Sequence, residues 1–144
     1  MNTIPLMNAD PAIKKLRESS KAVSVHSYSP YSKFKIGATL VIKGGKTFSG
    51  TNVENASFGL SMCAERNAIF QAVAHGEQQI ETMAIYSPLK THVVPCGVCL
   101  QVMIEFMQMD SSIYLFCESD DYIKEPFSYF LPHPFLKESL LNRD

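Results

Sequence analysis

Residues 63–117 read CAERNAIFQAVAHGEQQIETMAIYSPLKTHVVPCGVCLQVMIEFMQMDSSIYLFC and alternate between helical and extended patterns. Small and apolar residues recur at helical spacing over 64–73 and again over 98–107. Short apolar runs at 83–86 and 113–117 predict a strand after each helix. The resulting order of helix, strand, helix and strand is typical of parallel crossovers on a covered sheet.

The segments on either side of this stretch complete the predicted fold. Residues 10–23 begin with Asp-Pro, a helix start, and continue with an apolar helical face. Branched residues at 36–42 predict a strand, the paired glycines in 43–46 predict a hairpin turn, and 47–53 form the return strand. A terminal helix is predicted at 136–141. We therefore expect an α/β fold: a three-layer α/β/α sandwich whose central sheet is mixed, mostly parallel and opened by a β-hairpin.

Composition narrows the class of protein. The chain has 144 residues, which predicts one domain over 1–144, and its 46% hydrophobic content is typical of a globular protein. A formal net charge of −1 argues against duplex nucleic acid or an anionic membrane as partner. The sequence contains no apolar run of the ~20 residues that a membrane span needs and does not begin like a signal peptide. The default location is the reducing cytoplasm.

The four cysteines favour a metal over disulfides in such a compartment. Cys63 falls at one predicted helix start, and Cys96 and Cys99 fall at the next, whereas Cys117 lies in an apolar strand and is expected in the core. Three thiolates around Zn²⁺ leave one tetrahedral position for water, as in catalytic zinc sites.

The histidines do not complete this ligand set. His26, His92 and His133 have no partner at ligand spacing, and His75 lies at the far end of the helix that Cys63 begins. A lone histidine is more often a surface or core residue than a metal ligand.

Glu65 supplies the second half of the predicted chemistry. Residues two apart do not face each other within a regular helix, so Cys63 must lie at the helix mouth for Glu65 to share its cleft. A carboxylate there can accept a proton from water at the metal and deliver protons to a substrate. Taken alone, Glu65 and Arg66 are ordinary helix residues, and Cys-x-x-Cys is also found in redox pairs and structural zinc sites.

Together, Cys-Ala-Glu at one helix start and Pro-Cys-x-x-Cys at the next form the pattern of zinc deaminases. From about Tyr28 to Phe135 the sequence resembles the short, homotetrameric cytidine deaminases. The segments that carry the resemblance are YSKFKIGA (31–38), NVENASFGL (52–60), CAER (63–66), PCGVC (95–99) and LPHPF (131–135). The family commonly has Arg after the second cysteine of the pair, where this chain has Leu100 followed by Gln101.

The resemblance assigns roles to individual residues. It implies that Cys63, Cys96 and Cys99 hold Zn²⁺, that Glu65 moves the protons and that Arg66 hydrogen-bonds the ligand thiolates. It further implies a set of nucleoside contacts: Phe34, Asn52, Glu54, Ala64 and Phe135. Among these, Asn52 and Glu54 would bind the ribose hydroxyls, and Phe135 would stack on the base in a neighbouring subunit's pocket.

The implied reaction is hydrolytic deamination of cytidine, with deoxycytidine as a second substrate, to uridine or deoxyuridine and ammonia in pyrimidine salvage. Zinc is the only cofactor implied, and a homotetramer the implied assembly. Two alternatives stay open: a related zinc deaminase of another small aminopyrimidine or modified nucleoside, and a non-catalytic zinc-binding module. Polynucleotide editing is disfavoured, because the sequence lacks the basic, aromatic-rich pattern of a strand-binding groove.

Overall fold

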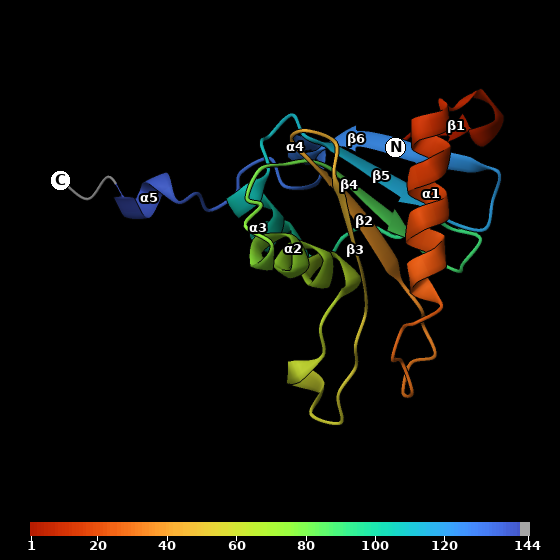
Figure 1. Ribbon diagram of the computed structural model, residues 1–144, viewed down its shortest axis with the longest axis horizontal. Coiled ribbons are helices and arrows are strands. Elements are labelled where there is room, and N and C mark those ends of the chain that lie inside the picture. Colours follow the sequence, from red (N-terminus) through yellow and green to blue (C-terminus); the bar gives the residue numbers. More distant parts are fainter. Residues whose placement is uncertain (142–144) are drawn as a thin grey trace.

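The computed structural model describes residues 1–141 of the chain (Figure 1). Its sheet comprises β1 (Thr3–Pro5), β2 (Gly37–Ile42), β3 (Thr47–Thr51), β4 (Ile80–Tyr86), β5 (Ser112–Phe116) and β6 (Asp121–Pro126). The helices are α1 (Pro11–Ser24), α2 (Ala64–Ala74), α3 (Gly97–Phe106), α4 (Phe127–Phe130) and α5 (Glu138–Leu141), with 3-10 turns η1 (Leu6–Asn8) and η2 (Phe58–Leu60). No helix within residues 1–141 combines the length and the hydropathy needed to cross a bilayer.

Helices cover both faces of the sheet, which confirms the predicted α/β/α layering (Figure 1). Side chains such as Leu40, Met83 and Leu115 pack on one face together with α2 and α3 and form the larger core cluster. On the other face, a smaller cluster that includes Tyr86 and Phe116 packs against α1 and the N-terminal segment. The alternating strand residues therefore feed two separate cores, as a sheet buried on both sides requires.

The sheet is mixed, as expected, but the prediction that it is mostly parallel is wrong. Its order is β1-β6-β5-β4-β2-β3, and of the five pairings within residues 1–141 only β4 with β5 is parallel. The difference comes from two strands that were not predicted: β6, which forms a hairpin with β5, and β1, which pairs antiparallel with β6. In addition, β2 lies between β3 and β4, so the crossover through α2 joins strands that are not neighbours.

Strand direction nevertheless follows the predicted crossovers. Both β3 and β4 run antiparallel to β2, and β5 runs parallel to β4. These three strands therefore point the same way, and their carboxyl ends lie at one edge of the sheet. The connections that lead to α2 and α3 leave from that edge.

Local signals placed most of the elements correctly. Helix α1 begins with Pro11 at its first turn, and the hairpin turn has positive φ at Gly44 and Gly45 (103° and 94°). Helix α2 ends before Gly76, whose φ of 85° is the left-handed conformation expected of a C-cap glycine. The terminal helix is shorter than predicted: α5 covers residues 138–141 instead of 136–141. All four of its residues are exposed.

Candidate metal centre and active site

Three cysteines meet where α2 and α3 begin. Cys63 is the N-cap of α2, Cys96 is the N-cap of α3, and Cys99 lies in the first turn of α3. Their Sγ atoms all lie within 4.8 Å of one another. The backbone N–H of Cys99 donates to Cys96 Sγ at 3.5 Å. Helix N-termini carry free N–H groups and the positive end of the dipole, so this position stabilises thiolates.

The charges around the cysteines fit a bound cation. The side chain of Arg66 donates to Cys63 Sγ at 3.5 Å. A hydrogen bond from the Cys99 thiol lowers the pKa of Cys63 to about 5, and Arg66 adds to the effect. The same hydrogen bond, with burial, raises the pKa of Cys99. Three sulfur donors at this spacing match the preference of zinc, and Arg66 offsets the surplus negative charge that three thiolates would bring.

Glu65 is buried beside this cluster. Only 6% of the residue is exposed. Burial, with the nearby Cys63 sulfur as a smaller contribution, raises the pKa of Glu65 to about 7. Glu65 is the second residue of α2 and Cys63 is its N-cap, so both groups lie at the N-terminal end of this helix, as predicted. A buried carboxylate next to a metal-ligand set is suited to accept and return a proton.

The segment around Asn52 is tied to the start of α2. Val53 and Met62 exchange two backbone hydrogen bonds of 2.9 and 2.8 Å, which brings residues 52–54 beside Cys63. The Asn52 side chain accepts from the Ile36 N–H at 2.9 Å and donates to the Phe34 carbonyl at 2.7 Å. It thereby fixes the chain next to Phe34, a half-buried ring that packs on the main core.

Glu54 is anchored on the other side of the same loop. One oxygen of its carboxylate accepts from the backbone N–H groups of Tyr31 and Ser32, each at 3.1 Å. Hydrogen bonding from Ser32 lowers the pKa of Glu54, which keeps the carboxylate charged. Lys33, the residue before Phe34, has a φ of 60°. The chain therefore makes a tight turn just before the Phe34 ring.

The remaining predicted contacts differ in exposure. Ala64 is fully buried in the first turn of α2, whereas 58% of Phe135 is exposed. The side chain of Gln101 on α3 donates to the carbonyl of Phe135 at 2.8 Å and so ties this segment to the helix that carries Cys99. Sequence reasoning missed the contact, although Gln101 follows the residue at which the chain departs from the family pattern.

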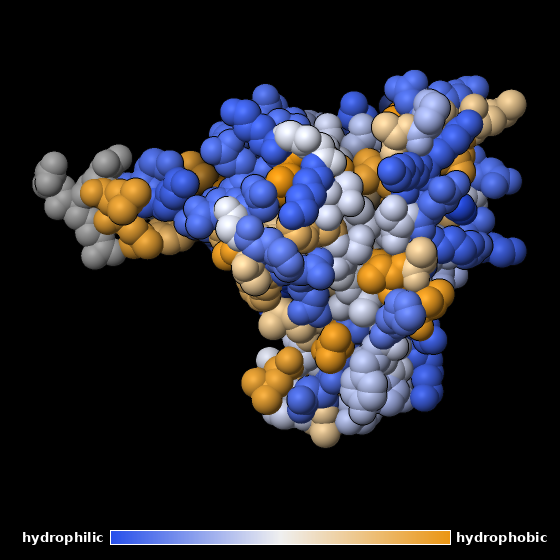
Figure 2. All heavy atoms as spheres, in the orientation of Figure 1, coloured by the Kyte–Doolittle hydropathy of each residue, from blue (hydrophilic) through white to orange (hydrophobic). Residues whose placement is uncertain are grey.

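Apolar side chains are exposed around the site. The loop between β3 and α2 projects from the body of the molecule, and apolar surface lies on it (Figures 1 and 2). On that loop Phe58 is 76% exposed and Leu60 is 68% exposed. A cavity of about 430 Å³ lies elsewhere, between η1 and α1, where it is lined by residues that include Leu6, Lys14 and Arg17.

The fold gives His92 neighbours that its spacing in the sequence does not show. Its ring nitrogen, the Cys117 sulfur and an Asp121 oxygen lie within 4.8 Å of one another. The three residues are far apart in sequence, and only the parallel pairing of β4 with β5 brings their loops together.

Comparison with known proteins identifies the family. Residues 12–115 match the model of the cytidine and deoxycytidylate deaminase zinc-binding region. A cytidine deaminase from Halalkalibacterium halodurans is 40% identical over 79% of this chain and 86% of its own length, and one from Sporosarcina psychrophila is 36% identical over 89% and 94%. The crystal structure of the Burkholderia pseudomallei cytidine deaminase has a TM-score of 0.81 and 40% identity over 85% of this chain and 98% of that one. The matched region includes all three clustered cysteines, and the chain belongs to the zinc-binding cytidine and deoxycytidylate deaminase family.

Proposed function

We propose that this chain is a zinc-dependent cytidine deaminase that converts cytidine, and deoxycytidine as a second substrate, to uridine or deoxyuridine and ammonia. The observation that carries the proposal is the meeting of Cys63, Cys96 and Cys99 at two helix starts, with buried Glu65 beside them. The similar proteins named above are cytidine deaminases, which supports the same reaction here and a role in pyrimidine salvage.

In the proposed mechanism the three thiolates hold the zinc ion. When bound, zinc lowers the pKa of water to about 7 and so supplies a nucleophile at neutral pH. Glu65 accepts a proton from the water that attacks C4 of cytosine and passes it to N3. It then moves the second proton of the same oxygen to the C4 amino group, which leaves as ammonia. Arg66, in contact with Cys63 Sγ, would offset the negative charge of the three thiolates, so that a bound metal would stay electrophilic.

The nucleoside would be held by the loops around the metal centre. After its hydrogen bonds within residues 1–141 Asn52 retains one N–H, and only one oxygen of Glu54 accepts from the backbone N–H groups, so a donor and an acceptor are left for the ribose hydroxyls. Phe34 and Ala64 would form apolar walls beside the sugar and base. The exposed Phe135 ring would stack on a base bound by a neighbouring subunit.

That last contact requires a second copy, and we propose a homotetramer in the cytoplasm. Exposed Phe58 and Leu60 on the projecting loop, together with exposed Phe135, supply apolar surface for contacts between subunits. The four cysteines are free, which suits a reducing compartment.

The experiment that tests the function is incubation of the zinc-loaded protein with cytidine, deoxycytidine and other aminopyrimidines, with loss of the amine followed by absorbance. We expect turnover of both nucleosides. Conversion of a different aminopyrimidine alone would favour the related deaminase, and no turnover of any substrate would favour a non-catalytic zinc module. The burial of Glu65 argues against that module, because a structural zinc site needs no carboxylate there.

Glu65→Gln is the sharpest variant for the mechanism. It keeps the side-chain shape and leaves all three sulfur donors in place, so zinc content and nucleoside affinity should stay unchanged. Turnover should fall by ~10²–10⁴, the range for loss of a general acid–base, and the loss should appear in kcat. The control is Glu105→Gln on the exposed side of α3, which should behave as wild type. Loss of zinc from Glu65→Gln would mean that Glu65 holds the metal site together.

A further inference from the structure

A second group of metal-ligating side chains lies where the connections after β4 and β5 run together. These strands are parallel neighbours, with Tyr86 opposite Phe116. Backbone hydrogen bonds extend the contact beyond the strands, from Ser87 N–H to the Phe116 carbonyl at 3.0 Å and from Glu118 N–H to the Leu89 carbonyl at 2.9 Å. The loop that leads towards the first metal centre is therefore held against the turn between β5 and β6.

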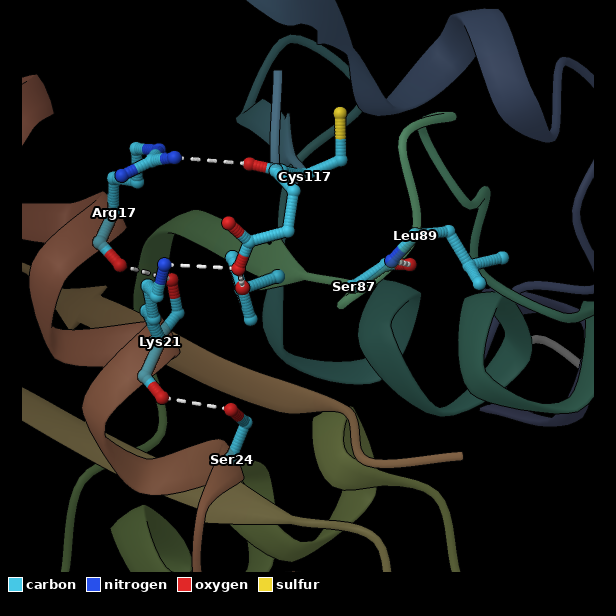
Figure 3. A network of polar contacts seen from close by, with 9 residues as sticks. Arg17, Lys21, Ser24, Ser87, Leu89 and Cys117 are labelled. Carbon is cyan, nitrogen blue, oxygen red and sulfur yellow. Dashed lines mark hydrogen bonds and ion pairs between the residues drawn. The ribbon is translucent and has the colours of Figure 1, made fainter. Parts of the chain in front are cut away.

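Three donors of different kinds converge there. Cys117 is fully buried, the side chain of His92 is 10% exposed and that of Asp121 is 32% exposed. Their ligand atoms lie within 4.8 Å of one another. Arg17 on α1 donates to the backbone carbonyl of Cys117 at 3.1 Å, and Figure 3 shows the Cys117 sulfur pointing away from Arg17. Arg17 therefore fixes the backbone of Cys117 from one side, and the thiol points to the other side, towards His92 and Asp121.

The distance between the nitrogen and oxygen donors fits a tetrahedral metal. His92 Nε2 lies 3.4 Å from Asp121 Oδ1 and 3.4 Å from the Asp121 carbonyl oxygen, both longer than the usual 2.7–3.2 Å of an N–H···O hydrogen bond. Two ligands of one tetrahedral zinc ion, each bonded at its ordinary length, lie roughly 3.3–3.8 Å apart. Ser119 adds a hydroxyl to the group, since its Oγ lies 2.8 Å from Cys117 Sγ and it donates to Asp121.

We infer that His92, Cys117 and Asp121 form a second zinc site, distinct from the cysteine site at the helix starts. Imidazole and thiolate exclude Ca²⁺ and Mg²⁺, which take oxygen ligands, whereas zinc accepts nitrogen, sulfur and oxygen together. One thiolate and one carboxylate balance the charge of a divalent ion. An ion at this site would tie the loop before Cys96 to the β5–β6 turn.

The experiment is metal stoichiometry of the full chain after loading with excess Zn²⁺ and removal of unbound ion. Wild type should hold two zinc ions per chain. His92→Gln and Cys117→Ala should each hold one, and the matched control His26→Gln, an exposed histidine, should hold two. Conversely, Cys96→Ala should keep the ion at the second site, so failure of the proposed active site would not be mistaken for failure of this one.

Two further readouts separate a built site from adventitious binding. Co²⁺ substitution should give a thiolate charge-transfer band of lower intensity in Cys117→Ala than in wild type. Zinc added to the singly loaded protein should raise the Tm of wild type and of His26→Gln but not that of His92→Gln. Saturation of wild type at one zinc per chain would overturn the inference. So would a second ion that persists in both His92→Gln and Cys117→Ala, or one that is also lost in His26→Gln.

Discussion

Replacing Gly50 with alanine would test how closely the position of the active-site helix depends on strand β3. A Cβ atom built at Gly50 would lie 2.4 Å from the backbone nitrogen of Ala68 and 2.7 Å from the carbonyl oxygen of Ala64. Both atoms belong to the backbone of α2, so no change of rotamer can relieve the overlap. Ordinary contacts to a Cβ begin at 3.4 Å, and α2 must therefore move away by about 1 Å.

The expected effect has two parts. Overpacking of a close-packed interface costs about 1–3 kcal/mol of unfolding free energy. The moving turn also carries Glu65, and a displacement of about 1 Å in a catalytic group can cost about 10²-fold in rate. We expect Gly50→Ala to fold and to bind zinc, because the cysteines keep their flexible side chains, but to deaminate cytidine about 10²-fold more slowly.

The assay is steady-state deamination of cytidine together with zinc content and denaturant unfolding. Gly59→Ala is the matched control, because a Cβ there meets no atom of residues 1–141 within 4 Å and Gly59 does not have positive φ. That variant should keep the rate and stability of wild type. If Gly50→Ala deaminates cytidine within twofold of wild type and unfolds at the same denaturant concentration, the packing of β3 does not set the position of Glu65.

Three further predictions concern the surroundings of the site. Arg66→Gln removes the guanidinium from Cys63 Sγ and should weaken zinc binding by roughly 10–100-fold in chelator competition; unchanged affinity would contradict the charge argument. Phe135→Ala should raise KM for cytidine and weaken self-association, and an active monomer in light scattering would refute its role between subunits. Gln101→Ala removes the hydrogen bond to the Phe135 carbonyl, about 1 kcal/mol, and should raise KM about fivefold with little change in kcat; a fall in kcat alone would point to a different role.

Sequence signals predicted the elements that have strong local causes. Pro11 starts α1, the glycine pair closes the hairpin, and Gly76 ends α2, because each of these positions needs a backbone conformation that few residues adopt. The same local reasoning placed Cys63 and Cys96 at helix N-caps. From there the clustering of three cysteines followed without knowledge of the sheet order.

Two strands, β1 and β6, were not predicted because their sequence patterns are weak or depend on distant pairing. Strand β1 has three residues and gains its place only by pairing with β6. Strand β6 reads DYIKEP, where Tyr122 and Ile123 are the buried residues and charged neighbours interrupt the alternation. The His92 cluster could not be predicted either, since its members come from the loop after β4, the turn after β5 and the first residue of β6, which are neighbours only through strand pairing.

The site itself depends on strand direction more than on strand pairing. The expectation of a mostly parallel sheet was wrong about neighbours, since β2 separates β3 from β4. It was right about direction, since β3, β4 and β5 all run the same way. Helices that follow strands of one direction begin at one edge of a sheet whatever lies between those strands. Cys63 therefore meets Cys96 and Cys99 at that edge, and the loop after β5 brings Cys117 to the same edge beside the loop that leads to Cys96. A change that reversed β4 would therefore remove both groups of ligands at once.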